Sequence, residues 1–432
     1  MIYDNLSTGD GGRLFFGGAD TVALAEKYGT PLYLIDSGRV LDNIRAFRRE
    51  MTKSFTPASR PAYASKALTF VSLCRLLAAE DVMLDAVSRG EIAVALRAGF
   101  NPARIIFHGN AKSEDELVYA VSHAVGLIAV DNLAELETLD RAALDAGRVQ
   151  DVILRLTPGV DPHTHDAVNT GSTLSKFGAA IEAGAAEELT AAALGCRGVR
   201  LRGFHCHIGS QIFEPEPYLE AARIMLDFMA LIREKYGYTA RILDLGGGFP
   251  VRYTEDDPPV DIPGTISLIG EQVRRICGEY SYPVPDVITE PGRSVVADAG
   301  ITLYTVRDVK KLPGKTFVAV DGGMTDNPRY ALYRSRYTVV NADRADAPAE
   351  LICDVAGRCC ESGDLIGKDL QIAEPRRGER LAVLTTGAYN YSMASHYNMT
   401  PNPPVVMISG GVDTLAVRRE TTEDLLSAFC EQ

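Results

Sequence analysis

The chain has 432 residues, 46% of them hydrophobic and 23% charged, as expected for a globular protein long enough for two domains. The net charge of −13 argues against a nucleic-acid partner, because a phosphate-binding surface needs clustered basic residues. We find no apolar run of about 18 residues and no signal peptide, so we expect no membrane partner and a cytoplasmic location. The 8 cysteines lack zinc-type spacing, so we expect reduced thiols and no metal.

Short apolar segments alternate with amphipathic ones such as EIAVALRAGF between about residues 36 and 293. Most apolar segments are rich in Val, Ile and Leu without polar alternation, which is typical of strands buried on both faces. Eight strands separated by helical intervals predict an α/β fold, a TIM-like (β/α)8 barrel. A doubly wound open sheet is the alternative, which the absence of an early GxGxxG disfavours. The expected strands are 61–66, 82–88, 104–109, 127–132, 152–158, 201–209, 242–248 and 286–293.

The pattern changes after residue 293, where short apolar segments are separated by Gly, Pro and Asp turns. No long helical pattern intervenes before EDLLSAFCEQ at the end, so residues 294–432 predict a smaller all-β domain, a barrel or a sandwich. We expect residues 1–35, which contain LFF and PLYLID, to join this β domain. Residues 36–293 would form the barrel domain.

Polar residues stand at the ends of the predicted strands, where (β/α) barrels place their active sites. Any single one of them is more often an ordinary solvated or packed side chain. Their convergence across most of the barrel is what indicates a site. They are Lys66, Asp85, Ser88, His108, Asn110, Arg155, His205, His207 and Ser210.

Glycine-rich turns follow the seventh and eighth predicted strands, in GGGF (246–249) and EPGR (290–293). Loops at these positions are the common phosphate site of such barrels, and glycine lets backbone N–H groups approach an anion. Taken alone, GGG is as often a flexible turn. A phosphate site opposite Lys66 on the first strand indicates a cofactor with both a phosphate and an aldehyde, namely pyridoxal 5′-phosphate (PLP).

Six motifs in order, YASKA, FHCHIGSQ, DLGGGFP, EPGRS, CESGD and GAYNYSMASHYN, carry a family resemblance. The chain resembles the PLP-dependent decarboxylases of the alanine-racemase-like fold, fold type III, and among them the meso-diaminopimelate decarboxylases. The resemblance implies a carboxy-lyase that converts meso-2,6-diaminopimelate to L-lysine and CO2, the last step of lysine biosynthesis. It also implies a homodimer in which Cys360 and Glu361 serve the active site of the partner subunit.

The resemblance further assigns the cofactor site. Lys66 would carry PLP covalently, His207 would stack on its ring, and Glu290 would pair with the ring nitrogen and keep it protonated. Asp85 and Arg155 would support the cofactor site indirectly, through the residues that contact the cofactor. The phosphate would be held by Ser210, Gly246, Gly247, Gly248, Gly292 and Tyr389, with Arg293 also counted in the cofactor site.

Substrate recognition would fall to Arg293, Arg329, Tyr333 and Tyr389 at the distal carboxylate, and to Glu361 at the distal ammonium. A guanidinium matches a carboxylate bidentately, which makes two arginines physically sensible there. Without the resemblance, a surface ion pair and a packed aromatic ring would explain Arg329 and Tyr333 better.

The adjacent Cys359 and Cys360 should differ in role, because neighbouring side chains in an extended segment face opposite ways. A thiol is mostly protonated at neutral pH, so Cys360 would act as the proton donor to the substrate carbanion. Cys359 would be a small packing residue.

Other functions stay open. They are a fold type III decarboxylase acting on ornithine, arginine or carboxynorspermidine, an amino-acid racemase, a non-catalytic relative, and a cofactor-independent barrel enzyme. The arginine in NPRYALY favours diaminopimelate, because ornithine would leave buried arginines without a counter-charge. The segment TGSTLSKFG (170–178) resembles the family's loop over the active site.

Overall fold

The computed structural model describes residues 3–161 and 176–430. Most of the segment 170–178 therefore lies outside the described residues. Contacts divide the chain into two compact units. We call Ile44–Pro250 with Val260–Gly292 the barrel unit, and Met1–Asn43 with Val251–Pro259 and Arg293–Gln432 the β-rich unit. The domain boundaries expected at 36 and 293 stay a prediction, because a unit defined by contacts need not coincide with a domain.

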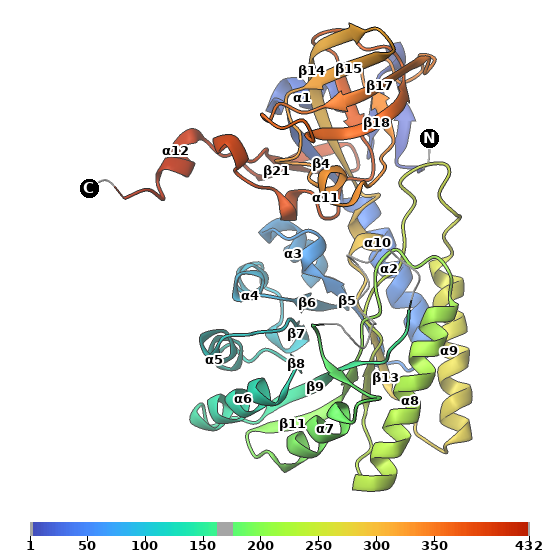
Figure 1. Ribbon diagram of the computed structural model, residues 1–432, viewed down its shortest axis with the longest axis vertical. Helices are drawn as coiled ribbons and strands as arrows, with labels where there is room; N and C mark the ends of the chain where they lie inside the picture. The colour runs from blue at the N-terminus through green and yellow to red at the C-terminus, as the bar shows by residue number, and fades with distance from the viewer. Residues whose placement is uncertain (1–2, 162–175, 431–432) are drawn as a thin grey trace. The chain divides into compact units, whose positions relative to one another are not determined.

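The barrel unit contains a closed ring of parallel strands (Figure 1). The order is β9-β11-β12-β13-β5-β6-β7-β8, and β8 pairs with β9 to close the ring. This closure confirms the predicted (β/α)8 barrel and excludes the open sheet. The strands, each overlapping a predicted segment, are β5 (Arg60–Ala64), β6 (Met83–Ala86), β7 (Ile105–Phe107), β8 (Leu127–Val130), β9 (Gln150–Thr157), β11 (Val199–His205), β12 (Ile242–Asp244) and β13 (Asp286–Thr289). The short β10 (Ala179–Ala180) extends β9.

The strands are apolar on both faces because one face lines the barrel interior and the other packs against helices. Every residue of β7 and β8 is buried. Side chains from several strands meet in one apolar cluster, which includes Ala62, Ile106, Ala129, Ile153 and Ile288. The lack of polar alternation in the sequence therefore has a direct structural cause.

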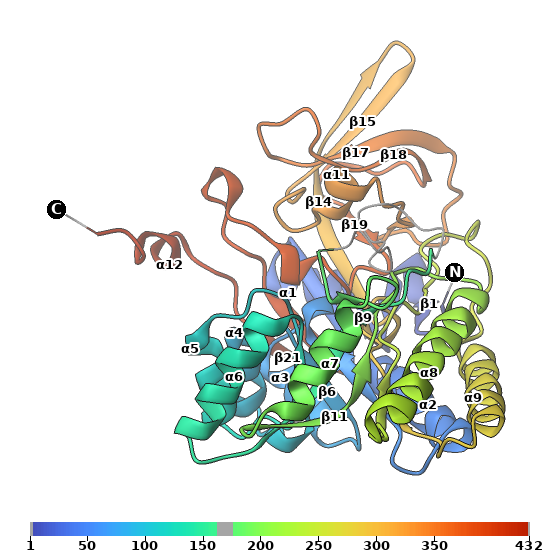
Figure 2. The same cartoon turned by 60° about the horizontal axis from the view of Figure 1, so that its bottom comes forward.

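Helices connect the strands on the outside of the barrel (Figure 2). Three of these helices have an N-cap side chain that accepts a hydrogen bond from a backbone N–H of the first turn. The caps are Ser88, Ser113 and Asn132. Ser88, one of the polar residues at the predicted strand ends, is therefore a helix cap. No described helix is long and apolar enough to cross a membrane. The helices are α3 (Val71–Ala78), α4 (Arg89–Arg97), α5 (Glu114–Ser122), α6 (Leu133–Asp145), α7 (Ala185–Gly195), α8 (Glu216–Tyr236) and α9 (Ile262–Glu279), and α2 (Ser37–Ser54) runs from the β-rich unit into the barrel unit.

The β-rich unit is built on a sheet with the order β18-β17-β15-β14-β4-β20-β21. Strand β4, from the start of the chain, pairs antiparallel with β14 and parallel with β20. The N-terminal segment is thus part of the same sheet as the C-terminal strands. The strands are β4 (Leu32–Asp36), β14 (Gly300–Leu312), β15 (Lys315–Val320), β16 (Val339–Asn341), β17 (Leu351–Ala356), β18 (Leu365–Ile372), β19 (Arg380–Val383), β20 (Val405–Ser409) and β21 (Val412–Val417).

A small sheet and short helices complete the β-rich unit. The sheet is β1 (Leu6–Thr8), β2 (Leu14–Phe16) and β3 (Ala19–Asp20). The helices are α1 (Thr21–Tyr28), α10 (Arg293–Val296), α11 (Arg329–Tyr333) and α12 (Thr422–Leu426). Phe16, Val22 and Leu34 share one apolar core with Leu303 and Ile408, which explains why the first residues pack with the last.

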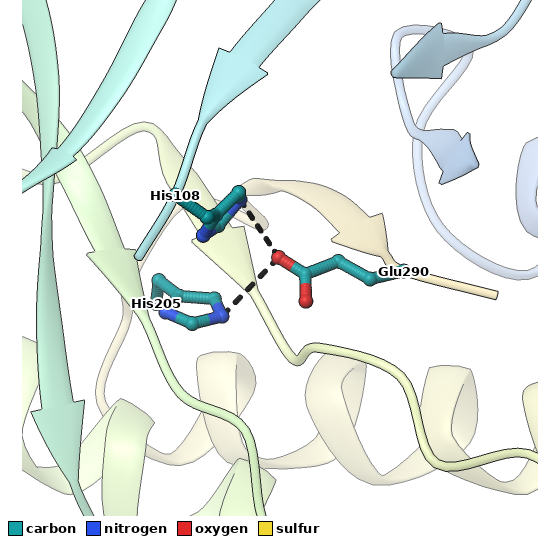
Figure 3. A group of neighbouring side chains, drawn as sticks. All are labelled: His108, His205 and Glu290. Carbon is teal, nitrogen blue, oxygen red and sulfur yellow. Dashed lines mark ion pairs between the residues drawn. The ribbon is translucent and has the colours of Figure 1, made fainter. Parts of the chain in front are cut away.

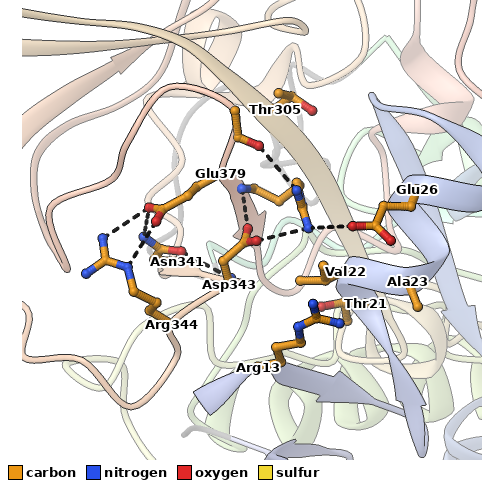
Figure 4. Close-up of polar contacts among 12 residues, drawn as sticks. Arg13, Thr21, Val22, Ala23, Glu26, Thr305, Asn341, Asp343, Arg344 and Glu379 are labelled. Atoms are coloured by element: carbon orange, nitrogen blue, oxygen red, sulfur yellow. Dashed lines mark hydrogen bonds and ion pairs between the residues drawn. The ribbon is translucent and has the colours of Figure 1, made fainter. Parts of the chain in front are cut away.

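Charged side chains also join the N-terminal segment to later strands (Figure 4). Arg380 contacts Asp343 at 2.9 Å and Glu26 of α1 at 3.4 Å. Arg344 pairs with Glu379 at 3.1 Å. Of these pairs, only that between Arg380 and Glu26 joins the first residues to later ones, and Glu26 is exposed, so the apolar core is the main link between these segments.

Candidate active site

Lys66 lies in a 3-10 turn, Ser65–Ala67, directly after β5. Its Nζ lies 3.6 Å from Oδ2 of Asp85, a fully buried residue of β6. Ser65 holds the turn by donating to the backbone oxygen of Asp85 at 2.8 Å or to the carboxylate of Glu91 at 2.6 Å. Neither carboxylate oxygen of Asp85 accepts a hydrogen bond from a described residue. Burial raises the pKa of Asp85, although Lys66 acts in the opposite direction.

His207 follows β11, and a hydrogen bond from the glycine turn sets its tautomer. The backbone N–H of Gly247 donates to Nδ1 of His207 at 3.1 Å, which leaves the proton of the neutral ring on Nε2. Desolvation and the nearby Lys66 lower the pKa of His207 well below its ordinary value, so the ring is neutral. A Cβ atom on Gly247 would lie 2.3 Å from the carbonyl oxygen of Glu290, so only glycine fits between these two strand ends.

Glu290 follows β13 and is buried between two imidazole rings (Figure 3). Its Oε1 lies 2.9 Å from Nε2 of His108 and 3.2 Å from Nε2 of His205. The distances are those of close polar contacts, although neither ring N–H is aligned as in an ideal hydrogen bond. Burial would raise the pKa of Glu290, but His108 and His205 outweigh it and hold the pKa well below its ordinary range.

Arg155 adds positive charge to this group. It is buried on β9, with its guanidinium 4.3 Å from the ring centre of Phe177. Burial lowers its pKa, and the carboxylates of Glu290, Asp131 and Asp85 act against that decrease. The barrel unit thus brings together the predicted Lys66, Asp85, Arg155, His207 and Glu290.

The chemistry of this group fits PLP. A lysine amine can hold the aldehyde, and a buried carboxylate can face the ring nitrogen. The glycine turn after β12 permits close approach of a phosphate to the backbone. Asp85 has buried oxygens that lack hydrogen bonds among the described residues, as expected where a further polar group binds. Ser210 follows β11, Gly246 and Gly248 flank Gly247, and Gly292 follows β13.

The β-rich unit holds a second group, built around two buried arginines. Arg293 begins α10 and donates from Nη1 to the hydroxyl of Tyr253 at 2.6 Å. Arg329 begins α11 and donates to Ser335 at 3.2 Å. Both guanidinium groups face aromatic rings, with Arg293 4.9 Å and Arg329 5.7 Å from the ring centre of Tyr389. The ring of Tyr333 lies 5.5 Å from the Arg329 guanidinium.

Tyr253 was missed by sequence reasoning. It lies in a Gly- and Pro-rich stretch, GGGFPVRYTEDDPP, that resembles an ordinary loop, and nothing local marks the residue. In the structure it is buried between the two arginines, 5.8 Å from Arg329 by ring centre. Burial would raise its pKa, but Arg293 and Arg329 together bring the pKa below its ordinary value. A phenol in such a positive environment is a strong donor to an incoming anion.

The two adjacent cysteines differ in surroundings. Cys359 is half-buried, its N–H donates to Asp364 at 2.6 Å, and burial together with Asp364 raises its pKa to about 11. Cys360 is exposed, and its N–H donates to Asn398 at 3.1 Å. Both are free thiols.

Glu361 is exposed beside Cys360, and it accepts a hydrogen bond from the hydroxyl of Tyr397 at 2.6 Å. Tyr397 and Asn398 were also missed as individual residues, although they lie within the motif GAYNYSMASHYN. Cys360 and Glu361 thus stand on the exposed loop between β17 and β18, held on one side by the segment around residue 398.

Comparison with known proteins gives a family match. Residues 41–297 match the family described as pyridoxal-dependent decarboxylase, pyridoxal binding domain. The chain is 43% identical to a diaminopimelate decarboxylase of Bacillus subtilis over 96% of this chain and 94% of the relative. It is 39% identical to that of Mycobacterium tuberculosis over 98% of this chain and 96% of the relative.

A solved structure of similar fold is the diaminopimelate decarboxylase of M. jannaschii in complex with L-lysine. It has a TM-score of 0.91 and 32% identity, and the alignment covers 99% of this chain and 98% of that one. The Helicobacter pylori enzyme complexed with L-lysine has a TM-score of 0.85 and 31% identity, over 94% of this chain and 98% of that one.

Proposed function

This chain belongs to the pyridoxal-dependent decarboxylases, and we propose that it removes one carboxylate of meso-2,6-diaminopimelate and releases L-lysine and CO2. Relatives over nearly the whole length are named diaminopimelate decarboxylase, at 43%, 41% and 40% identity. The observation that carries the substrate assignment is the pair of buried arginines, Arg293 and Arg329, that share Tyr253.

Bound PLP supplies the electron sink for the electron pair left when the bond between Cα and the carboxylate breaks. Lys66 would tether the cofactor through its side-chain amine. Glu290 would keep the ring nitrogen protonated, and the neutral His207 would stack on the ring. Within the barrel unit, the N–H groups of the glycine turn and of Gly292 and the hydroxyl of Ser210 would bind the phosphate, and the family resemblance adds the hydroxyl of Tyr389.

The arginines recognise the end of the substrate that does not react. Meso-diaminopimelate carries a second amino-acid group there, whereas ornithine and lysine carry only an ammonium. A carboxylate between Arg293 and Arg329 neutralises two buried cations, and the hydroxyl of Tyr253 adds a third donor. An ornithine in the same place would leave both cations without a counter-charge, which costs several kcal/mol in a dry site.

Protonation completes the reaction. After CO2 leaves, the carbanion at Cα takes the thiol proton of Cys360, and the resulting thiolate takes a proton back from solvent. Glu361 provides a negative charge for the distal ammonium, and Tyr397 holds its carboxylate in place. Cys359 is half-buried beside Asp364, whereas Cys360 is exposed, so we assign the exchange to Cys360.

We further propose a cytoplasmic homodimer in which Cys360 and Glu361 serve the active site of the partner subunit. The free thiols of the described cysteines suit a reducing compartment. The exposed position of Cys360 and Glu361 in the β-rich unit supports a role toward a second chain. We also keep the division into a PLP-binding barrel domain and a β domain as a proposal.

The decisive experiment compares substrates with the PLP-loaded protein. Meso-diaminopimelate, ornithine, lysine and arginine are supplied separately, and CO2 and amine products are measured by mass spectrometry. We expect CO2 and lysine from diaminopimelate only. Release of CO2 from ornithine or lysine at a similar rate would overturn the substrate assignment, and loss of the bound-cofactor absorbance in Lys66→Ala checks the cofactor site.

A second experiment compares Arg329→Gln with a control variant to test the role of Arg329 in substrate binding. Arg329→Gln should raise the KM for diaminopimelate by about 10- to 100-fold, the loss of a charge-assisted hydrogen bond of about 1.5–3 kcal/mol. Arg336→Gln is the control, because Arg336 is exposed and pairs at 2.7 Å with Asp256, which is also exposed. Equal effects of the two changes would contradict a specific role for Arg329.

A further inference from the structure

His108, His205 and Glu290 form a cluster that the reaction described above uses only in part. All three residues are buried, and their ligand atoms lie within 4.8 Å of one another. The imidazole rings meet edge to face, with centroids 4.7 Å apart. Both rings point toward the same carboxylate oxygen, Oε1, and neither reaches Oε2 (Figure 3).

We propose that His108 and His205 are positioning residues that hold Glu290 ionised and oriented, so that its second oxygen meets the ring nitrogen of PLP. The inference rests on the proposed function, since it assigns Glu290 to the ring nitrogen. It adds two residues to which neither the family resemblance nor the comparisons give a role.

The physical reason is that Glu290 and the pyridine nitrogen of PLP compete for one proton. A carboxylate buried without donors becomes more basic, and it would then draw the proton away from the pyridine nitrogen. The Nε2 atoms of His108 and His205 lie 2.9 and 3.2 Å from Oε1, and polar contacts this close stabilise the anion and leave the proton on the pyridine ring. A protonated ring is the better electron sink, so the histidines would raise the rate without touching the substrate.

The other charged neighbours are consistent with this arrangement. Burial and the adjacent Glu290 raise the pKa of Asp244 well above its ordinary value, so that residue is neutral and the pair carries one negative charge. Burial lowers the pKa of His205 to about 4, and the cation of Arg155 adds to that decrease. His205 is therefore a neutral N–H donor.

A divalent metal is the competing explanation for two histidines and a glutamate. The surrounding charge disfavours it, because Arg155 and Lys66 lie in the same group and would repel a dication. A tightly bound metal would also occupy Glu290, which the cofactor needs.

The test uses the full-length protein loaded with PLP that carries 15N in its ring. The 15N chemical shift reports the protonation of the ring nitrogen independently of activity. We expect a protonated nitrogen in the wild-type protein, and a shift toward free pyridine in the double variant His108→Leu/His205→Leu. His108→Gln and His205→Gln, which keep a donor, should retain most of the protonated signal, and they remain informative if the double variant does not fold.

Kinetics and controls complete the design. We expect kcat to fall by about 10- to 100-fold in the double variant, the range typical of residues that orient a primary ligand, with little change in KM. His123→Leu, at an exposed histidine, should change neither the shift nor the rate. Glu290→Gln should lose the protonated signal on its own.

The outcomes separate the two proposals. A wild-type nitrogen without a proton would overturn the role of Glu290 and with it the proposed function. A protonated nitrogen in both the wild-type protein and the double variant would overturn the histidine inference alone. Binding of one Zn2+ per chain to the cofactor-free protein, lost in His108→Leu, would show that the cluster is a metal site.

Discussion

Buried charge dominates both groups of functional residues. In the barrel unit, Asp85 and Glu290 are buried beside Lys66 and Arg155, and in the β-rich unit Arg293 is buried beside aromatic rings. Burial of a charge is costly unless partners compensate it, so such residues are poor choices for stability alone. Their presence is better explained by a ligand that supplies the missing charge.

Tyr253 provides a test at this scale. Tyr253→Phe removes the hydroxyl that accepts from Arg293 at 2.6 Å, while the ring and its packing remain. We expect the KM for diaminopimelate to rise about tenfold with a smaller change in kcat, because the group binds the non-reacting end. Steady-state kinetics on Tyr253→Phe and on the exposed control Tyr236→Phe would reveal it, and an unchanged KM would remove Tyr253 from the site.

The segment between β17 and β18 shows how one element separates two similar residues. Asp364 accepts N–H groups from Met324 and Cys359, each at 2.6 Å, and so ties this loop to the segment that precedes α11. Cys359, whose N–H is one of these donors, is half-buried, whereas Cys360 is exposed. The element therefore decides which thiol can act.

Two single substitutions test whether Cys360, and not Cys359, is the proton donor. Cys360→Ala should slow turnover by about 100-fold, the scale of a lost general acid. Cys359→Ala should leave turnover nearly unchanged, with at most a modest loss of stability. Rates from CO2 release would decide, and the idea fails if Cys359→Ala is the slower protein.

Asp326, in the turn before α11, should make stability depend on pH. It is buried, accepts a hydrogen bond from Tyr304 at 2.5 Å, and burial raises its pKa to about 7. The unfolded chain, with a pKa of about 3.9, loses this proton at lower pH, so the folded state binds the additional proton between about pH 4 and 7. The contribution of Asp326 to stability is therefore greatest below about pH 4, falls as the pH rises from about 4 to 7, and is lost above pH 7.

The expected loss between pH 5 and pH 8 is about 2.5 kcal/mol from this residue alone. Asp326→Asn cannot titrate, so it should lack that part of the decrease. Urea unfolding of the two proteins at both pH values measures the difference. Parallel behaviour of wild type and variant would contradict the buried, protonated state of Asp326.

At the scale of the whole molecule, the proposed dimer predicts complementation between inactive chains. Lys66→Ala and Cys360→Ala are mixed under conditions that exchange subunits. Random pairing gives half hybrid dimers with one intact site of two, so we expect about a quarter of the wild-type activity. Lys66→Ala mixed with Glu290→Gln is the control, since both residues belong to the barrel unit and no intact site can form.

If the mixture of Lys66→Ala and Cys360→Ala shows no activity, analytical ultracentrifugation measures whether the chains form dimers. Hybrid dimers without activity would place Lys66 and Cys360 of the working site on one chain. Absence of any dimer would overturn the proposed assembly itself.

Much of this molecule follows from local sequence. Apolar runs without alternation predict buried parallel strands, and serine or asparagine before an amphipathic stretch predicts a helix start, as at Ser113 and Asn132. Polar residues at strand ends, such as Lys66, predict the edge at which chemistry takes place. These signals are local because hydrogen bonding and side-chain direction within one element depend on neighbouring residues.

Contacts between distant residues required the tertiary structure. Arg293 and Tyr253 are 40 positions apart, and Glu290 meets both His108 and His205 only because three strands end at one rim of a closed ring. No local pattern encodes such meetings, since they depend on how the strands pair and close. The sequence by itself determined the barrel, the cofactor class and the family, whereas the tertiary structure decided which buried charges lie within reach of one another.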